Sequence, residues 1–215
     1  MQDWDKWLIQ YRQERMDASS ELFNDKRREF HLARYKFALD YVPDKIVGDM
    51  ACGTGYGTKL LAQRAQKVHG VDCNIQAIQY AMEKHNAPNI QYTHAFVNWM
   101  PLNNEAMDVI VSFETIEHVE NDVLVIKEFH RLLKPEGVLI ISTPNNWGTS
   151  KYHKKAYTLE SFRELLSGWF TIGVEFNQNS GSAFTMNRKQ SAGIIPTTQD
   201  NQHLAECFIM VCVKE

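Results

Sequence analysis

A glycine-rich segment directly after a short apolar run is the feature that most constrains the fold of this chain. The run 45–47 leads into residues 49–57, which read Asp-Met-Ala-Cys-Gly-Thr-Gly-Tyr-Gly. Glycines at alternating positions allow backbone angles and a close approach that a Cβ blocks. The helix that follows offers unpaired N–H groups in its first turn. The segment therefore predicts a strand, a glycine turn and a helix that together bind a nucleotide-like ligand.

The spacing of the glycines narrows the choice of ligand. The dinucleotide fingerprint needs Gly-x-Gly-x-x-Gly or Ala, whereas this chain has Thr58 at the third fingerprint position. Asp49, just before the glycines, suits a ligand with positive charge better than a pyrophosphate. Together these features argue against a nicotinamide cofactor. They favour S-adenosylmethionine, which carries positive charge on its sulfonium and its amine.

Length and charge exclude several classes of protein. The 215 residues, 44% of them apolar, suit one compact unit with a single core. We expect residues 1–42 to form an N-terminal helical cap and residues 43–215 to form the ligand-binding domain. A net charge of -3 supplies no basic field for a nucleic-acid backbone, so we expect no nucleic-acid partner.

The sequence also indicates where the protein resides. The N-terminus does not have the basic segment followed by an apolar segment that is typical of a secretory signal peptide. No apolar stretch approaches the roughly 20 residues of a membrane span. The four cysteines show neither metal-type pairing nor regular disulfide spacing, which favours reduced thiols. We therefore expect a cytoplasmic protein that does not bind membranes.

Hydrophobic periodicity predicts two N-terminal helices followed by alternating strands and helices. The first helices are expected near residues 4–11 and 19–41, with Ser20 as the cap of the second. The alternation beyond residue 45 predicts an α/β fold with a doubly wound, mostly parallel sheet. The predicted strands are 46–49, 68–71, 90–93, 107–113, 138–143, 170–176 and 206–213, and the helices are 56–64, 75–84, 121–133 and 158–167, the last capped by Thr158. The polar segment 178–203 is expected to be a mobile loop or a substrate-side insertion.

Several spaced motifs resemble one family. They are His31-Leu-Ala-Arg34-Tyr35, the glycine segment, Glu114-Thr-Ile-Glu-His118-Val119, Leu133-Lys-Pro-Glu-Gly137 and Thr143-Pro-Asn145. The chain resembles the class I, seven-stranded S-adenosylmethionine-dependent methyltransferases, and within them bacterial enzymes linked to cell-surface sugars or secondary metabolites. The resemblance implies the sheet order 3-2-1-4-5-7-6 with the seventh strand antiparallel. It also implies S-adenosylmethionine as cofactor, S-adenosylhomocysteine as product, a small-molecule acceptor and a monomer or homodimer.

The residues expected to bind the cofactor follow the first two strands. Asp72 lies at the carboxyl edge of the sheet, where a carboxylate can accept both ribose hydroxyls. Asn74 either contacts the adenosine or is simply the N-cap of the following helix. The candidates in this half are Asp49, Ala51, Gly53, Gly55, Tyr56, Asp72, Cys73 and Asn74.

The adenine contact departs from the family pattern. The family presents an acid after its third strand, but residues 94–101 of this chain contain none. Phe96, with Val97 beside it, either stacks on the base or packs in the core with Trp99. Both alternatives remain open from the sequence.

The methionine part of the cofactor is expected to face the end of the fourth strand. Ser112, Phe113 and Glu114 lie there, at the edge where open α/β sheets bind ligands. We further predict that Arg34 or Tyr35, on the second helix, contacts the methionine carboxylate, because that charge needs a partner.

The candidate catalytic residues are His118 and His153. Both are placed at the functional edge, and histidine is the side chain best suited to accept a proton near neutral pH. His118 has an equally good explanation as a buttress of the turn 114–119. Methyl transfer from a sulfonium is an in-line displacement, so the sequence-based prediction includes no metal.

The leading functional hypothesis is methyl transfer to a hydroxyl of a small polar acceptor such as a sugar or nucleotide-sugar. N-methylation of an amino sugar or other small amine, and O-methylation of a quinol or aromatic, are the alternatives within the family. A nucleotide-dependent oxidoreductase and a cofactor-binding module without catalysis are the alternatives from other classes.

Overall fold

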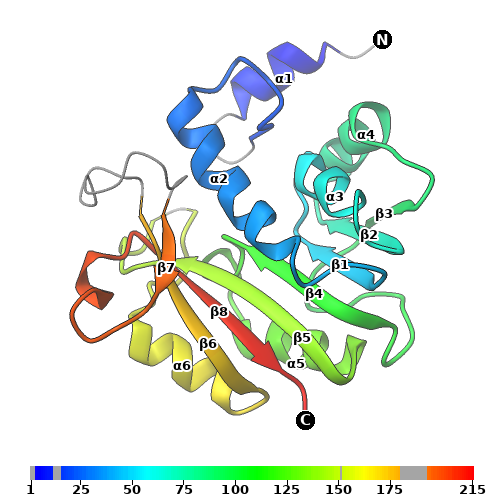
Figure 1. Cartoon of the computed structure of the whole chain (residues 1–215). Helices are drawn as coiled ribbons and strands as arrows, with labels where there is room; N and C mark the ends of the chain where they lie inside the picture. The colour runs from blue at the N-terminus through cyan, green and yellow to red at the C-terminus, as the bar shows by residue number, and fades with distance from the viewer. Residues whose placement is uncertain (1–2, 12–15, 151, 180–192) are drawn as a thin grey trace.

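The architecture was obtained as a computed structural model. It describes residues 3–11, 16–150, 152–179 and 193–215. The described chain forms a mixed sheet of eight strands with helices on both faces (Figure 1). None of the helices in these ranges is long and apolar enough to cross a membrane.

The elements alternate as the sequence pattern predicts. The strands are β1 Ile46–Met50, β2 Lys67–Asp72, β3 Ile90–His94, β4 Met107–Phe113, β5 Leu133–Pro144, β6 Thr171–Gln178, β7 Ile194–Pro196 and β8 Cys207–Val213. The helices are α1 Trp4–Gln10, α2 Asp25–Ala38, α3 Tyr56–Leu61, α4 Ile75–Lys84, α5 Asp122–Leu132 and α6 Leu159–Ser167, with 3-10 turns η1 Ile116–His118 and η2 Gln202–Leu204.

The sheet order is β3-β2-β1-β4-β5-β8-β6-β7. The five strands β3, β2, β1, β4 and β5 are parallel, and β8 lies antiparallel between β5 and β6. The expected order is thus correct for the first seven strands, with β8 in the place of the antiparallel seventh. The expectation of seven strands is wrong, because the short β7 pairs antiparallel with β6 and adds an eighth at the edge.

Two other predictions about the elements are corrected. The second helix begins at Asp25 rather than near Ser19, because the Asn24 side chain accepts a hydrogen bond from the Arg27 N–H and caps it there. The fifth strand begins at Leu133 rather than at residue 138, and a register shift in its pairing with β4 accommodates residues 134–137. Thr158 caps α6 as predicted.

The segment 178–203 contains more regular structure than expected. Strand β7 and turn η2 both lie in it, so its described part is not a plain loop. Residues 180–192 lie outside the described residues, and the expectation for them is not addressed by the structure.

Apolar side chains form one core on each side of the sheet. Helices α5 and α6 cover one face through Phe129 and Phe162, and helices α2 and α3 cover the other through Ala38 and Leu61, all four fully buried. A smaller cluster attaches α1 to α4, where Trp7 stacks on Tyr80 with ring centroids 5.7 Å apart. The N-terminal helices therefore pack directly onto the sheet domain.

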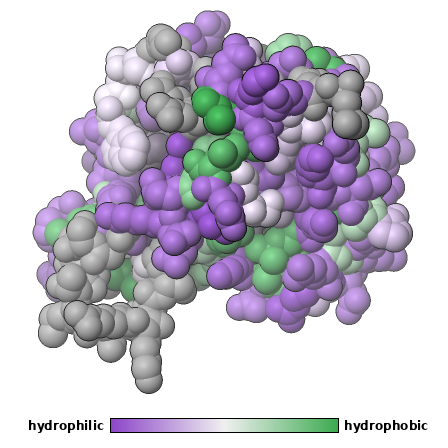
Figure 2. Space-filling view, turned by 90° about the horizontal axis from the view of Figure 1, so that it is seen from above, coloured by the Kyte–Doolittle hydropathy of each residue, from purple (hydrophilic) through white to green (hydrophobic). Residues whose placement is uncertain are grey.

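Parallel strands β1, β2 and β4 end at the same edge of the sheet. The loops that follow them contain most of the residues singled out from the sequence. Strand β8 runs in the opposite direction, so its first residue, Cys207, lies at this edge beside Pro144. The view from above, in Figure 2, shows a largely hydrophilic surface with small hydrophobic patches near its centre.

Candidate active site

The glycine loop after β1 has the backbone conformation that its sequence predicts. Ala51, Gly53 and Gly55 have positive φ angles of 63°, 57° and 84°. A Cβ on Gly53 would meet no atom of the described residues within 4 Å, whereas a Cβ on Gly55 would lie 2.6 Å from Ala81 and Tyr92. Gly55 is thus required by packing, and Gly53 leaves open space for a ligand against the backbone.

The third glycine allows α2 to approach the loop. A Cβ on Gly57 would lie 2.0 Å from the Tyr35 ring. Tyr35 also stands edge-on to Tyr56, with ring centroids 5.5 Å apart. The glycines therefore have two different roles. Gly53 leaves open space beside the loop, and Gly57 allows the Tyr35 ring to pack against α3.

Asp49 lies beneath this loop and is fully buried. Its carboxylate accepts hydrogen bonds from the Thr58 hydroxyl at 2.6 Å and from the Tyr35 hydroxyl at 3.2 Å. Burial raises the pKa of Asp49 to about 7, although both hydrogen bonds act in the opposite direction. The side chains of Asp49 and Tyr35, both expected at the cofactor, thus bind each other.

Asp72 connects the ends of β1 and β2. Its Oδ2 accepts the Gly53 N–H at 2.9 Å and its Oδ1 accepts the Asn74 N–H at 2.8 Å. Both carboxylate oxygens therefore accept backbone N–H groups, one from each of the two loops. Asp72 therefore lies next to the open position at Gly53, and its contact to a ribose stays a prediction.

The two residues after Asp72 have structural roles as well. The Asn74 side chain caps α4 by accepting the Ala77 N–H at 2.9 Å. Cys73 is exposed, and its carbonyl lies 2.9 Å from His94 Nε2. Asn74 therefore performs the capping role that was one of its two alternatives.

Phe96 and Trp99 are not part of the core. They are 66% and 68% exposed and face each other across a short antiparallel bridge, with Val97 half-buried between them. The alternative that these rings pack in the core is wrong. Phe96 remains available to stack on an adenine.

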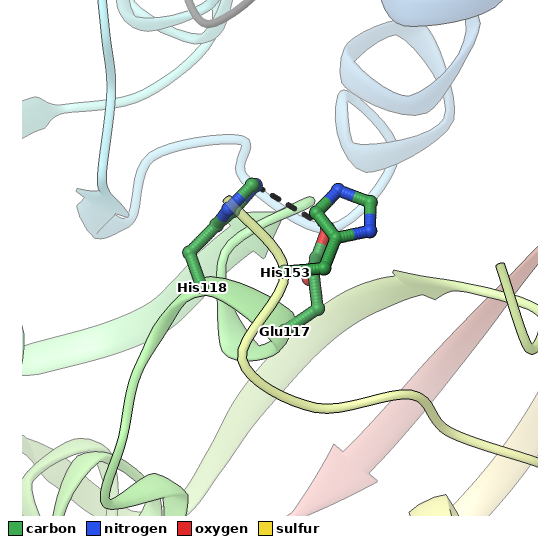
Figure 3. Close-up of side chains that lie close together, drawn as sticks. All are labelled: Glu117, His118 and His153. Atoms are coloured by element: carbon green, nitrogen blue, oxygen red, sulfur yellow. Dashed lines mark ion pairs between the residues drawn. The ribbon is translucent and has the colours of Figure 1, made fainter. Parts of the chain in front are cut away.

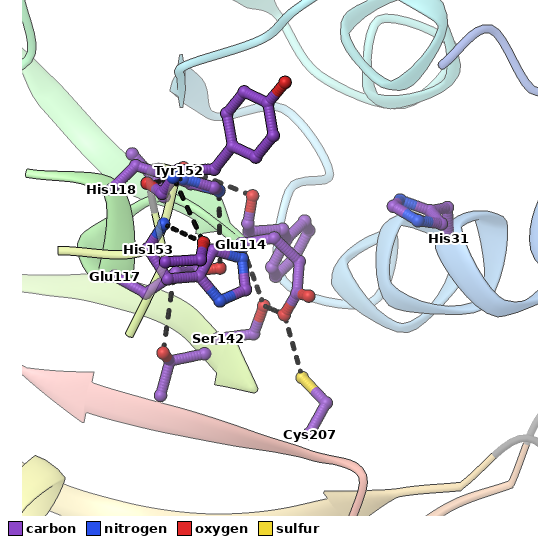
Figure 4. Close-up of polar contacts among 12 residues, drawn as sticks. His31, Glu114, Glu117, His118, Ser142, Tyr152, His153 and Cys207 are labelled. Carbon is purple, nitrogen blue, oxygen red and sulfur yellow. Dashed lines mark hydrogen bonds and ion pairs between the residues drawn. The ribbon is translucent and has the colours of Figure 1, made fainter. Parts of the chain in front are cut away.

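The end of β4 is sharply bent. Ser112 is buried and donates to the Met50 carbonyl at 3.3 Å, and Phe113 packs edge-on against Tyr35 at 5.0 Å. Glu114 has a φ of 52°, which is unusual for a residue with a side chain. Its Oε1 accepts from the Cys207 thiol at 3.2 Å (Figure 4).

Beyond this bend, Glu117, His118 and His153 form a compact cluster (Figure 3). The His118 and His153 rings are 4.9 Å apart, and His118 Nε2 lies 3.7 Å from Glu117 Oε1. The loop that carries His153 is held against η1, because the Lys154 N–H donates to the Glu117 carbonyl at 2.7 Å. Both predicted catalytic histidines thus meet at one place.

The electrostatics of this cluster are unusual. Burial and the nearby charge of Glu114 raise the pKa of Glu117 well above its ordinary value. Partial burial and the neighbouring His118 lower the pKa of His153. A neutral imidazole with a lowered pKa is able to accept a proton at pH 7.

Arg34 lies deeper than the sequence prediction implies. It is 1% exposed, and its guanidinium donates to Gln178 Oε1 at 2.8 Å and to His31 Nδ1 at 3.1 Å. The described contacts of Arg34 therefore connect α2 to β6, and the contact to a cofactor carboxylate remains a prediction.

Comparisons with known proteins identify the family. Residues 48–141, from β1 to β5, match the model of the methyltransferase domain family. A probable S-adenosylmethionine-dependent methyltransferase of Mycolicibacterium smegmatis is 33% identical over 141 residues, which cover 62% of this chain and 53% of that protein. Residues 48–141 are therefore a methyltransferase domain, and the chain is similar to S-adenosylmethionine-dependent methyltransferases.

Other methyltransferases share parts of the sequence or the fold. A ubiquinone biosynthesis O-methyltransferase of Haemophilus ducreyi is 34% identical over 108 residues, 47% of this chain and 46% of that protein. A methyltransferase structure from Listeria monocytogenes superimposes with a TM-score of 0.65 at 17% identity, covering 86% of this chain and 99% of the other. The chain spans about half the length of these two curated relatives.

The described residues fit the cofactor of this methyltransferase family. Gly53 leaves a space that a Cβ would enter, and Asp72 lies directly beside it. Exposed Phe96 offers an aromatic face near the end of β3. These residues would hold the adenosine of S-adenosylmethionine, in accord with the prediction from the glycine spacing.

One member of the cluster, Glu117, was not among the site residues predicted from the sequence. Glu117 is 2% exposed, and its Oε1 has no hydrogen-bond partner within the described part of the chain. The signal was present, because an acid directly before His118 and three residues after Glu114 must lie close to both once the chain turns. His118 and His153 were each predicted as catalytic residues, but the contact between them was not predicted.

Proposed function

We propose that this methyltransferase transfers a methyl group to a hydroxyl of a small polar acceptor, with a sugar or nucleotide-sugar as the leading class. The observation that carries the proposal is the meeting of His118 and His153 just beyond the end of β4, with ring centroids 4.9 Å apart. A hydroxyl must lose its proton as its oxygen attacks, and these imidazoles are the groups able to take it.

The cofactor, when bound, supplies a methyl group on a positively charged sulfur. The chain's own residues have to orient the acceptor and exclude water around it. His153 accepts the hydroxyl proton in this proposal, and the Tyr152 carbonyl, 2.9 Å from His118 Nδ1, fixes the ring of His118.

The loop after β5 supports a polar acceptor. Residues 146–150 are all exposed, and Trp147 is 65% exposed. Exposed polar groups beside an aromatic face suit a small molecule that carries hydroxyls. One relative is named as a ubiquinone biosynthesis O-methyltransferase, which supports oxygen as the acceptor atom and keeps a quinol as the second candidate.

The proposal also includes the expectations drawn from charge and composition. They are a small-molecule acceptor, no nucleic-acid partner, and a cytoplasmic monomer or homodimer. The family assignment leaves no support for the nucleotide-dependent oxidoreductase considered from the sequence.

The test is transfer of labelled methyl from S-adenosylmethionine to nucleotide-sugars, quinols, amino sugars and other small amines, with cofactor binding measured in parallel. We expect transfer to a hydroxyl-bearing class, and loss of transfer in His153→Ala with cofactor affinity retained. Transfer only to amines would overturn the choice of acceptor atom. Cofactor binding without transfer to any class would indicate a binding module.

A further inference from the structure

The cluster of Glu117, His118 and His153 has the donor atoms of a metal site. One oxygen and two ring nitrogens, one from each residue, all lie within 4.8 Å of one another. Donors about 2.0–2.2 Å from a shared cation lie roughly 3–4 Å apart. Small rotations of the exposed His118 and half-buried His153 side chains would bring these atoms to that spacing.

A second observation points to a ligand at the same place. Glu117 is 2% exposed, and its Oε1 makes no hydrogen bond to any of the residues that the structure describes, although buried polar atoms nearly always have a partner. Its Oε2 accepts from the Thr143 hydroxyl across a long distance of 3.4 Å. The unpartnered oxygen points toward His118, from whose Nε2 it is 3.7 Å away.

The orientation of His118 is that of a metal ligand. A carbonyl only accepts hydrogen bonds, so His118 Nδ1 carries the proton that it donates to the Tyr152 carbonyl at 2.9 Å. In the neutral ring, Nε2 is then left with its lone pair facing Glu117. Histidines that bind metals usually donate their other nitrogen to a carbonyl or carboxylate in this way.

The surrounding charge is also suitable. Figure 4 shows the Glu114 side chain beside those of Glu117 and His153. Two carboxylates near one another repel, and a bound cation relieves that repulsion. The backbone of Glu117 is fixed independently, because its carbonyl accepts the N–H groups of Lys154 and Lys155.

We propose that Glu117, His118 and His153 bind one divalent transition-metal cation, and that the acceptor hydroxyl occupies an open position on it. Two nitrogens and one carboxylate oxygen form a donor set that zinc, cobalt, iron and manganese accept, with positions left for other ligands. This proposal rests on the proposed transfer to a hydroxyl. It replaces the expectation that no metal is needed, and it replaces the role of His153 as proton acceptor with that of a metal ligand.

The chemical role follows from the charge of the cation. A divalent cation lowers the pKa of a hydroxyl that it binds. The hydroxyl proton leaves to solvent, the oxygen forms a bond to the methyl carbon, and the methyl–sulfur bond breaks with its electron pair left on sulfur. The cation keeps its oxidation state throughout, so no other reactant is required.

The first experiment measures binding of the cation, without any acceptor. The full chain is freed of metal by a chelator and titrated with Co²⁺, followed by visible absorption, and with Zn²⁺, followed by calorimetry. We expect one cation per chain and ligand-field bands typical of nitrogen and oxygen ligands. Glu117→Gln, His118→Ala and His153→Ala should each weaken binding by about 10–100-fold or more, since the loss of even an outer partner has that effect.

A matched variant and a folding control keep the result interpretable. His203→Ala removes an exposed histidine of η2 and should leave cation affinity unchanged. Circular dichroism establishes that each variant is folded. Cation affinity of the wild type equal to that of the three cluster variants would overturn the proposal.

Activity distinguishes this proposal from the proposed function. Transfer to a hydroxyl that stops on chelation and returns with Co²⁺ or Zn²⁺ supports both. Transfer that is unaffected by chelation overturns the metal site and leaves hydroxyl methylation standing. Specific cation binding, lost in the cluster variants, with transfer to no hydroxyl supports the site and rejects the acceptor.

Discussion

The Oδ2 of Asp72 accepts the backbone N–H of Gly53 at 2.9 Å, and so fastens the end of β2 to the glycine loop after β1. The same carboxylate accepts the N–H of Asn74 at 2.8 Å. One side chain therefore fixes both loops that would surround the ribose of the cofactor.

The first prediction concerns this carboxylate. Asp72→Asn should weaken the affinity for S-adenosylmethionine by about 10–100-fold, because hydrogen bonds to a charged group contribute about 1.5–3 kcal/mol. Calorimetric titration with the cofactor measures it. Asp108→Asn is the matched control, because Asp108 also accepts a backbone N–H, from Ile46, but at the start of β1. Equal loss of affinity in both variants would show that the effect is not local.

The second prediction separates the glycines. Gly57→Ala should lower the free energy of unfolding by about 1–3 kcal/mol, because the new Cβ would overlap the Tyr35 ring. Urea denaturation measures this, and adding Tyr35→Val should restore part of the loss. Gly53→Ala should chiefly reduce cofactor affinity, since its Cβ enters open space and only the positive φ adds strain. The prediction fails if the two alanine variants behave alike.

The third prediction concerns pH. The folded-state pKa of Asp49, about 7, is above its ordinary value of 3.8, so the folded protein holds this proton more tightly than the unfolded chain does. Stability from this group is therefore present at low pH and is lost as the pH rises from about 4 to about 7. In the absence of cofactor, the free energy of unfolding of Asp49→Asn should vary less between pH 5 and pH 8 than that of the wild type. An identical pH dependence would contradict the assignment.

The fourth prediction concerns the buried cation on α2. Arg34→Met should lower the free energy of unfolding by about 3–5 kcal/mol, since it leaves Gln178 without its donor and Glu114 without a neighbouring positive charge. Arg64→Met removes an exposed pair with Asp40 and should cost less than about 1 kcal/mol. Cofactor titration of folded Arg34→Met also tests the predicted contact to the methionine carboxylate, which an unchanged affinity would exclude.

Local signals in the sequence predicted most of the fold. Alternating runs and caps such as Thr158 depend on neighbouring residues, so α6 and the strands were found within a few positions. Strand β7 was missed because three residues at a sheet edge have too short a pattern to identify. The start of α2 was misplaced because Ser20 and Asn24 are both good caps, and tertiary packing decides between them.

The candidate site was predictable residue by residue but not as an arrangement. The glycine spacing and the position of Asp72 depend on one loop each, and the structure brings these loops together. The contact between His118 and His153 joins η1 to a loop 35 positions further on, which no local pattern specifies. The engagement of Asp49 by Tyr35 was likewise hidden, because it depends on how α2 crosses the sheet.

The place of β8 between β5 and β6 has a consequence for the order of folding. Residues 46–144 contain all that is needed to assemble strands β3, β2, β1, β4 and β5. Strand β6 pairs with β8 and not with β5, so it cannot join the sheet until residues 207–213, which form β8, are available. On the ribosome, the half of the sheet with the glycine loop can therefore form first. Until β8 pairs with it, the edge of β5 has no neighbouring strand. This edge includes Ser142, whose Oγ accepts the Glu114 N–H. Synthesis itself would then separate in time the two halves of the site that catalysis needs together.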